Sequence, residues 1–235
     1  MVLEERLEQG LSKWNIPYSD TMLRQFRTYY SMLEEKNKVM NLTAIEGERD
    51  TAELHFLDGA YIIKDHDLKS ASIADIGSGA GFPGLVLKIL LPESKVLLVD
   101  SLDKRVRFLQ EVCEELDLKD IACMHSRAEE LPKEYRGSFD LVTSRAVARM
   151  RVLSELCMPY VRQGGSFIAM KGPVCSEEVQ EAANAIRKLG GKPAKIIDYT
   201  IPDCDVTHSL VEVVKDGITS EKYPRRWSQI KNSPL

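Results

Sequence analysis

The chain has 235 residues, of which 43% are hydrophobic and 29% charged, as is typical of a globular protein with a sizeable buried core. No apolar run approaches the roughly 20 residues of a membrane-spanning helix, and the acidic N-terminus lacks a signal-peptide pattern. Five cysteines without a C-x-x-C pair argue against a disulfide framework or a zinc site, so we expect a cytoplasmic protein with no membrane partner and no metal.

Residues 1–65 are expected to form a helical module. Apolar residues recur at helical spacing over 22–33, and Ser19 or Asp20 is suited to cap the start of that helix. A polar break follows, and then a second helical pattern around His55. This stretch contains no glycine-rich nucleotide turn, so we expect an appended module that packs on the main domain.

From residue 66 onward, predicted strands and helices alternate. Strands are expected at 72–76, 95–100, 120–124, 139–144, 165–170, 195–201 and 208–214, and helices at 83–91, 103–117, 149–158 and 176–189. This alternation predicts right-handed crossovers and a mostly parallel sheet with helices on both faces. The last two strands are joined by a link too short for a helix, so they should form an antiparallel hairpin. This Rossmann-like α/β order over 66–235 is typical of the class I S-adenosylmethionine (SAM)-dependent methyltransferase fold, whereas dehydrogenase domains lack the final hairpin.

A glycine-rich turn connects the first strand to the first helix of this domain. Segment 75–84 reads Asp-Ile-Gly-Ser-Gly-Ala-Gly-Phe-Pro-Gly, which fits both the dinucleotide pattern G-x-G-x-x-G and the D-x-G-x-G-x-G turn of SAM methyltransferases. A carboxylate at the strand end suits a ligand with an ammonium and a sulfonium, and it would repel a pyrophosphate. The turn therefore favours SAM, with S-adenosylhomocysteine as the product, over a dinucleotide or a purely structural turn. The candidate contacts are Asp75, Gly77, Gly79, Gly81 and Phe82.

Two further segments are candidates for the adenosine part of the ligand. Asp100 ends the second strand, about 20 residues after the turn, where an acid can accept both ribose hydroxyls. Dinucleotide enzymes use the same device, so Asp100 indicates adenosine without distinguishing the two cofactors. Ala128 and Glu129 follow the third strand and are candidates to line the adenine end, although a plain helix start explains them equally well.

The fourth strand runs into Ser-Arg-Ala-Val-Ala at 144–148, where this architecture brings donor and acceptor together. Asn-Pro-Pro-Tyr, which suits exocyclic amines, is absent, as is the Pro-Cys thiolate of pyrimidine carbon-5 methylation. N7 of guanine needs neither, because its in-plane lone pair carries no proton, and catalysis would reduce to positioning. Arg145 and Lys171, facing each other across the site, are the candidate catalytic residues that would hold guanine O6 or a phosphate. The alternative to a catalytic role is a salt bridge at the rim for Arg145 and an exposed strand end for Lys171.

Basic residues gather in two segments, although the net charge of the chain is −4. Segment 143–171 has five basic residues against one acidic, and segment 215–235 has five against two. The tail at 223–227 interleaves aromatic rings with arginines, a pattern suited to base stacking and phosphate contact. Local patches of this kind allow an RNA partner despite the acidic total.

The four histidines are scattered without metal-ligand spacing. His208 falls in a predicted strand and is expected to be structural. His55 belongs to the same helical module as Asn-Leu-Thr at 41–43. From there its side chain can reach the acceptor pocket, but a role in helix packing is the simpler expectation.

Five blocks, in this order along the chain, resemble the 16S ribosomal RNA small-subunit methyltransferase G family, also called glucose-inhibited division protein B. They are Asn-Leu-Thr-Ala-Ile at 41–45, His-Phe-Leu-Asp at 55–58, the turn at 75–84, Ser-Arg-Ala-Val-Ala at 144–148 and Lys-Gly at 171–172. The glycine turn is common to many methyltransferases, whereas Gly-Phe-Pro-Gly with Ser-Arg-Ala-Val-Ala is specific. The resemblance spans essentially the whole chain and implies SAM-dependent methylation of N7 of guanine 527 in bacterial 16S rRNA.

The resemblance also implies roles for individual residues. The cofactor would be held by Gly77, Phe82, Asp100 and the pair Ala128 and Glu129, and Arg145 would sit between cofactor and substrate. The tail departs from the family at 227–230, where Trp-Ser-Gln-Ile replaces a stretch with a glycine and a proline. Its role in RNA contact is therefore open.

Three alternatives stay open. Methylation of another base or of a ribose 2′-hydroxyl would use Lys171 as a base. A nicotinamide-dependent oxidoreductase would need a proton-relay residue near the turn, and none is evident. A non-catalytic ribosome-binding module would keep the fold, but the intact Asp75, glycine turn and Asp100 argue against it. The expected partner is naked 16S rRNA or the 30S subunit, and a monomer is favoured.

Overall fold

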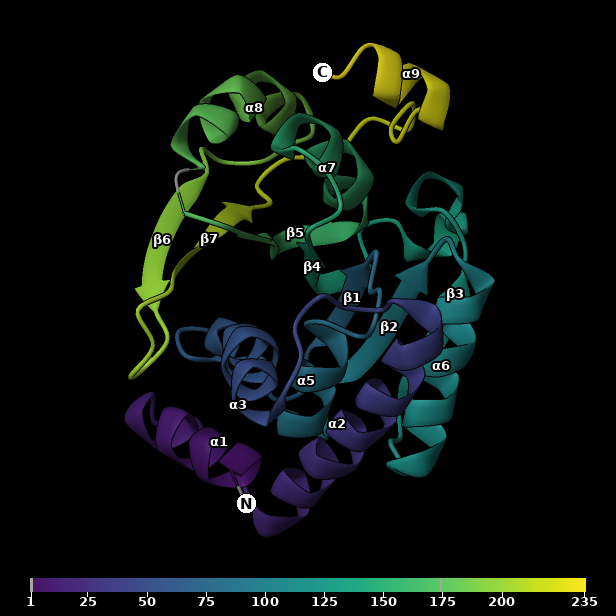
Figure 1. Cartoon of the computed structure of the whole chain (residues 1–235). Helices are drawn as coiled ribbons and strands as arrows, with labels where there is room; N and C mark the ends of the chain where they lie inside the picture. The colour runs from purple at the N-terminus through teal and green to yellow at the C-terminus, as the bar shows by residue number, and fades with distance from the viewer. Residues whose placement is uncertain (1, 174) are drawn as a thin grey trace.

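A seven-stranded sheet forms the centre of the computed structural model, which describes residues 2–173 and 175–235 (Figure 1). Its spatial order is β3-β2-β1-β4-β5-β7-β6. The strands are β1 (Ser72–Ile76), β2 (Lys95–Asp100), β3 (Ile121–His125), β4 (Phe139–Arg145), β5 (Val161–Lys171), β6 (Lys195–Thr200) and β7 (Thr207–Val214). β1 to β5 pair in parallel, and β7 pairs antiparallel with both β5 and β6, which confirms the predicted sheet and its closing hairpin.

β5 begins four residues earlier than the sequence predicted. Gly164 and Gly165 allow this, because Gly164 adopts φ +80° and a Cβ at Gly165 would lie 2.6 Å from the backbone oxygen of Asp140. The register between β4 and β5 shifts at this place. The two glycines therefore allow an irregular start of β5, which an alternating apolar pattern in the sequence does not predict.

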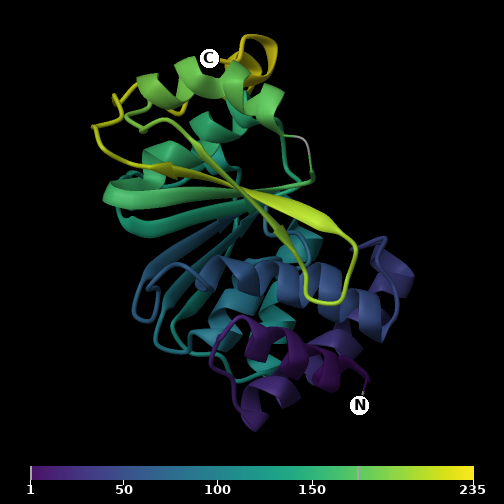
Figure 2. The same cartoon turned by 90° about the vertical axis from the view of Figure 1, so that its left-hand side faces the viewer.

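Helices cover both faces of the sheet, and each face has its own hydrophobic core (Figure 2). One face carries α5 (Gly84–Leu90) and α6 (Asp103–Glu115). The other carries α7 (Met150–Cys157), α8 (Ser176–Lys188) and α9 (Trp227–Asn232), together with the 3-10 turns η3 (Ala128–Glu130), η4 (Lys133–Tyr135) and η5 (Met158–Tyr160). The four predicted helices are confirmed within two residues at each end, and Gly190 with φ +83° follows the end of α8.

The N-terminal segment folds as a set of helices packed beneath α5 and α6. Its elements are α1 (Val2–Lys13), α2 (Asp20–Met40), α3 (Glu48–Thr51), the π-helical η1 (Ala52–Leu57), α4 (Asp58–Ala60) and the 3-10 turn η2 (Tyr61–Ile63). Ser19 caps α2 as predicted, because its side chain accepts a hydrogen bond from the Met22 amide. Phe26 and Phe56 share one core with Leu85 and Leu98, so these helices and the sheet face form a continuous interior.

The C-terminal tail packs against α7. Arg225 donates to both carboxylate oxygens of Glu155, at 2.8 and 2.6 Å, and the Glu155 side chain is fully buried. Tyr223 is buried, and the guanidinium of Arg225 is engaged by Glu155. Neither Tyr223 nor Arg225 is therefore presented for the RNA contact suggested by the sequence. Arg226 remains exposed. In the part of the chain that the structure describes, no helix is both long and apolar enough to span a membrane.

Candidate active site

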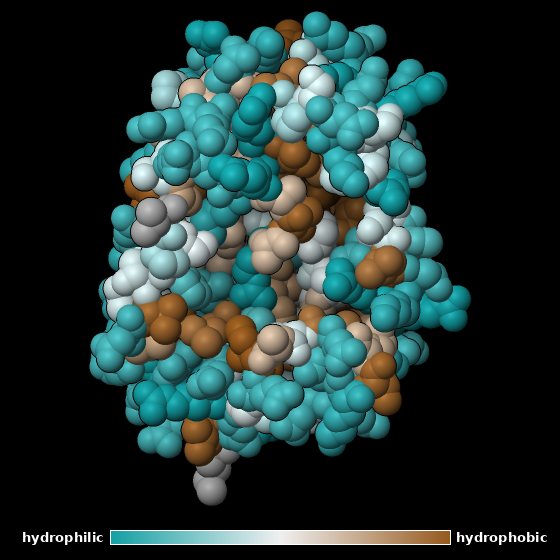
Figure 3. Space-filling model, turned by 45° about the horizontal axis from the view of Figure 1, so that its top comes forward, coloured by the Kyte–Doolittle hydropathy of each residue, from teal (hydrophilic) through white to brown (hydrophobic). Residues whose placement is uncertain are grey.

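A cavity of about 740 Å³ opens where β1, β2, β4 and β5 end, between the sheet and the N-terminal helices. Figure 3 shows the surface hollowed at its centre, with polar and apolar residues mixed around the rim. The glycine turn and Asp100 line one side of the cavity, and His55, Asp58 and Arg145 line the other. Parallel strands deliver their carboxyl ends to one edge, so this is the place where the topology gathers side chains from different strands.

The turn between β1 and α5 is built on backbone conformations that favour glycine. Gly77, Gly79 and Gly81 adopt φ of +74°, +60° and +107°. A Cβ at Gly81 would lie 2.7 Å from the hydroxyl of Tyr29, which donates a 2.5 Å hydrogen bond to the Ala80 carbonyl. A Cβ at Gly79 would meet only the Gly77 carbonyl, at 3.9 Å. The turn is thus supported from α2 below and leaves Gly79 open towards the cavity.

Asp75 lies behind the turn and does not line the cavity. Its Oδ2 accepts a 3.0 Å hydrogen bond from the Gly84 amide at the start of α5, and among the described residues its Oδ1 has no partner. The side chain is fully buried, and this burial raises the pKa of Asp75 to about 7. The direct ligand contact expected of this carboxylate is not supported by its placement. It instead holds the first turn of α5 against the glycine turn.

Asp100 lies at the cavity wall, as the sequence predicted. Its Oδ2 accepts from the Gly79 amide and its Oδ1 from the Leu102 amide, both at 2.9 Å. Each oxygen keeps a lone pair, so the carboxylate is oriented and can still accept further hydrogen bonds. Ala128 and Glu129 lie in η3, and neither lines the cavity.

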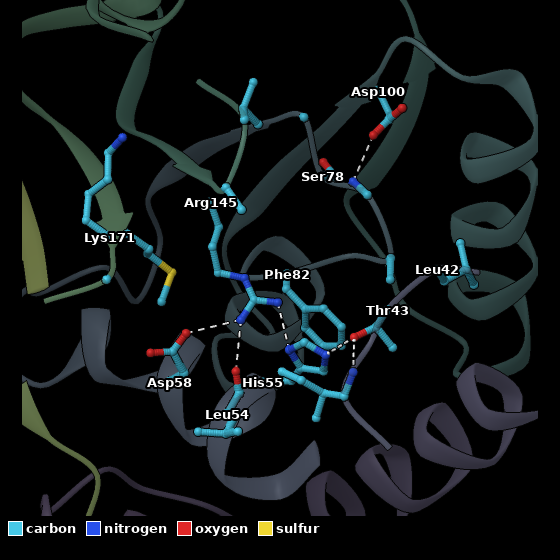
Figure 4. A pocket seen from close by; sticks show the side chains of 18 of the residues that line it. Leu42, Thr43, Leu54, His55, Asp58, Ser78, Phe82, Asp100, Arg145 and Lys171 are labelled. Atoms are coloured by element: carbon cyan, nitrogen blue, oxygen red, sulfur yellow. Dashed lines mark hydrogen bonds and ion pairs between the residues drawn. The ribbon is translucent and has the colours of Figure 1, made fainter. Parts of the chain in front are cut away.

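Arg145 extends from the end of β4 towards the N-terminal helices (Figure 4). Its Nη1 donates to the Leu54 carbonyl at 3.0 Å and to Asp58 Oδ2 at 3.1 Å. Its Nη2 donates to His55 Nδ1 at 2.7 Å, and the guanidinium carbon lies 4.9 Å from the centre of the Phe82 ring. The helical module therefore forms half of the site, and η1 and α4 supply all three acceptors.

His55 is neutral in this environment. Burial, and then the charge of Arg145, lowers its pKa to about 3. Because Nδ1 accepts from Arg145, the ring hydrogen is on Nε2, which donates to the Thr43 hydroxyl at 2.8 Å. The ring is buried and stacks on Phe82 but also lines the cavity, so its role is not confined to helix packing. The π-helical η1 places this side chain, as such segments often do at functional sites, and the sequence signal was the His-Phe-Leu-Asp block.

Asp58 was missed as a site residue by the sequence reasoning. Its side chain is 4% exposed and bonds Arg145, the Tyr199 hydroxyl at 2.5 Å and Nδ1 of His208. Burial alone would raise the pKa of Asp58, but the hydrogen bond from His208 and the charge of Arg145 hold it below its ordinary value. The same hydrogen bond raises the pKa of His208. His208 also lines the cavity, so its role is not confined to the strand.

Lys171 lines the cavity from the end of β5, but its amino group does not approach Arg145 (Figure 4). It donates to the Ala148 carbonyl at 2.8 Å and to Glu178 Oε1 at 2.7 Å. The predicted pair of cations facing each other across the site is therefore not formed. Both contacts hold the amino group away from Arg145, so Lys171 is poorly placed to act as a general base there.

Residues 22–205 match the family described as rRNA small subunit methyltransferase G. Proteins named ribosomal RNA small subunit methyltransferase G are 44% identical in Clostridium botulinum (strain Loch Maree / Type A3) and 47% in Clostridium tetani (strain Massachusetts / E88), each over 97% of both chains. That of Staphylococcus saprophyticus is 45% identical, also over 97% of both chains.

Solved structures share the fold at low sequence identity. Precorrin-6y C5,15-methyltransferase from Geobacter metallireducens superposes with a TM-score of 0.54 at 9% identity, over 74% of this chain and 92% of that one. The M. jannaschii protein TYW2, in complex with AdoMet, superposes with a TM-score of 0.51 at 12% identity, over 62% and 68% of the two chains. These matches support the class I methyltransferase architecture.

Proposed function

The chain belongs to the rRNA small subunit methyltransferase G family, and from this premise we propose that it transfers a methyl group from SAM to N7 of guanine 527 in 16S rRNA. One observation carries the proposal within the structure: a single cavity has the glycine turn and Asp100 on one side and the Arg145 cluster on the other. The first side suits an adenosine-type methyl donor, and the second suits a polar base edge or a phosphate. The rRNA substrate implies work in the cytoplasm.

The residues on the donor side fit SAM. Open space above Gly79 lets a ligand reach the bare turn, where a Cβ would intrude. The oriented Asp100 carboxylate has lone pairs left for two ribose hydroxyls. Bound there, SAM supplies an electrophilic methyl group on a sulfonium. The protein's own task on this side is to hold the donor and keep its direction fixed.

The acceptor side fits a nucleophile that needs no deprotonation. His55 is neutral and its Nδ1 is already occupied by Arg145, while Lys171 is paired with Glu178. Neither group is free to remove a proton. Guanine N7 carries none, so positioning alone can supply the rate enhancement. Arg145 would donate to guanine O6, an acceptor that arginine side chains often bind, or to a neighbouring phosphate.

The main rival is methylation of a ribose 2′-hydroxyl, which requires a general base. Lys171 was the candidate for that role, and its ion pair argues against it. A nicotinamide-dependent oxidoreductase is disfavoured by the family match and by the antiparallel hairpin that closes the sheet. Neither rival has a structural observation in its favour.

Methyl transfer tests the proposal directly. The protein is incubated with tritiated SAM and either naked 16S rRNA or assembled 30S subunits, both from a strain that lacks this methyltransferase. The modified nucleoside is then identified by mass spectrometry, and the modified position by sequencing the labelled fragment. We expect 7-methylguanosine at position 527 and loss of transfer with Asp100→Ala. A different methylated nucleoside, or no transfer to either substrate, would overturn it.

A further inference from the structure

The carboxylate of Asp58 is a junction between parts of the chain that are far apart in sequence. It begins α4 and accepts hydrogen bonds from Arg145 of β4, Tyr199 of β6 and His208 of β7. The partners lie 87, 141 and 150 positions away along the chain. Only 4% of its side chain is exposed, so the three contacts replace solvent almost completely.

The junction restricts how Arg145 can point. Its Nη1 is fixed by Leu54 and Asp58, and its Nη2 by His55. A guanidinium has five N–H donors in a planar fork, and the described residues accept three of them. The remaining two, on Nε and Nη2, are free to meet an acceptor in the cavity that Arg145 lines. Their direction depends on the plane of the guanidinium, which Asp58 helps to set.

We propose that Asp58 and His208 are positioning residues that hold Arg145 in the orientation needed to receive the methyl acceptor. The inference rests on the proposed function and adds two residues to the acceptor side of its site. His208 acts through Asp58: its Nδ1–H holds one carboxylate oxygen, and the other oxygen is left to face Arg145. Tyr199 holds the same oxygen as His208 and stacks on Tyr61.

The charges around the junction are consistent with this role. Asp58 is ionised beside Arg145, burial and Asp58 raise the pKa of Tyr199 so that it stays neutral, and His55 is neutral. Lys171, which also lines the cavity, forms an ion pair with Glu178. His208 donates through Nδ1 whether or not its ring is charged, so Arg145 stays held in both states. Protonation of His208 changes only the charge of its ring, from zero to +1, and leaves the hydrogen bond to Asp58 in place.

Two substitutions of His208 distinguish the contribution of its hydrogen bond to Asp58 from the contribution of its ring to packing. His208→Asn places an amide N–H near the position of Nδ1, whereas His208→Leu places none. We expect His208→Leu to lower kcat about 10-fold to 100-fold, the usual effect of losing a hydrogen bond to a charged group, and His208→Asn to stay within about threefold of wild type. The affinity for S-adenosylhomocysteine, measured by calorimetry, should change less than about twofold in both.

His66→Leu is the matched control. His66 also pairs with a carboxylate, Glu212, at 3.2 Å, but it does not line the cavity. Its substitution should leave kcat and donor affinity unchanged. If His208→Leu lowers kcat no more than His66→Leu does, the proposal is wrong. A fall in donor affinity or melting temperature that accounts for the lost activity would show a merely structural role and would also overturn it.

The orientation of Arg145 can also be measured without catalysis, so its result does not depend on the proposed function. The nitrogen-15 resonance of Arg145 Nε–H, assigned with Arg145→Lys, reports whether the guanidinium is held. We expect a protected signal in the wild type and in His208→Asn, and a broadened one in Asp58→Asn and His208→Leu. Unchanged signals in both of the latter would refute the positioning role. If the wild-type protein transfers no methyl group, the proposed function fails while this measurement still decides the role of Asp58.

Discussion

The rings of His55 and Phe82 stack face to face, with centroids 4.1 Å apart and planes inclined by 14°. His55 belongs to η1 of the N-terminal helices and Phe82 to the glycine turn. Arg145 lies over the same Phe82 ring, 4.9 Å from its centre. The glycine turn and the Arg145 side of the cavity are therefore in direct contact through one aromatic side chain.

Replacing Phe82 with leucine should affect both sides at once. Phe82 is 4% exposed and stacks with both His55 and Tyr29, so the loss of its ring removes two stacking contacts. We expect Phe82→Leu to lower the free energy of unfolding by about 1–3 kcal/mol and to reduce both kcat and donor affinity. Phe108→Leu is the control, because Phe108 of α6 is equally buried but does not line the cavity. Urea unfolding and calorimetry distinguish the two, and equal effects on affinity would contradict the prediction.

Gly79 and Gly137 form a matched pair for testing the glycine turn. Both adopt φ +60°, and an added Cβ would meet no atom closer than 3.9 Å at Gly79 or 4.0 Å at Gly137. Substitution by alanine should cost each about 1–2 kcal/mol of stability, because the left-handed conformation is strained for alanine. Only Gly79→Ala places a methyl in the cavity, so it alone should weaken S-adenosylhomocysteine binding, by about tenfold or more. Similar affinities in the two variants would show that the ligand does not approach Gly79.

The pH dependence of stability should reveal the buried Asp75. Burial raises its folded-state pKa from 3.8 to about 7, so ionisation penalises the folded state, and the free energy of unfolding should fall as pH rises from about 4 to 7. The full shift corresponds to at most about 4 kcal/mol. Asp75→Asn keeps an acceptor for the Gly84 amide and cannot ionise, so its stability relative to wild type should increase over this range. Exposed Asp117→Asn serves as the control, and parallel curves for Asp75→Asn and wild type in urea unfolding would count against the assignment.

The ion pair between Arg225 and Glu155 should stabilise the tail. Removing Arg225 leaves a fully buried carboxylate without its charged partner, so Arg225→Ala should lower the free energy of unfolding by about 3–5 kcal/mol. Neighbouring Arg226 is exposed, and Arg226→Ala should stay within about 0.5 kcal/mol of wild type. Thermal or urea unfolding compares the two. An Arg225→Ala protein of wild-type stability would mean that the tail is available for another partner.

The sequence predicted the sheet well because local patterns determine it. Buried parallel strands give short apolar runs, and the short link before β7 leaves room only for a hairpin, so all seven strands were found. Asp100 was placed correctly for the same reason, since its position follows from the end of a strand. Gly164 and Gly165 extended β5 beyond its apolar run, and this could not be inferred from periodicity.

Long-range side-chain pairing could not be read from the sequence. Asp58 was not predicted as a site residue, because its partners Arg145 and His208 are distant in sequence. Lys171 does not face Arg145 as predicted, because it pairs with Glu178 instead. Asp75 fits the ligand-binding motif in sequence, but strand β1 turns its side chain towards α5. A motif fixes which residue is present, whereas its contacts depend on the fold around it.

The Asp58 junction also joins segments that are translated at very different times. The glycine turn and Asp100 are synthesised early, and Asp58 earlier still, but its last partner is 150 positions further along the chain. The glycine-turn side of the cavity is thus synthesised well before the last contact of the Asp58 junction. That contact can form only once β7 has left the ribosome.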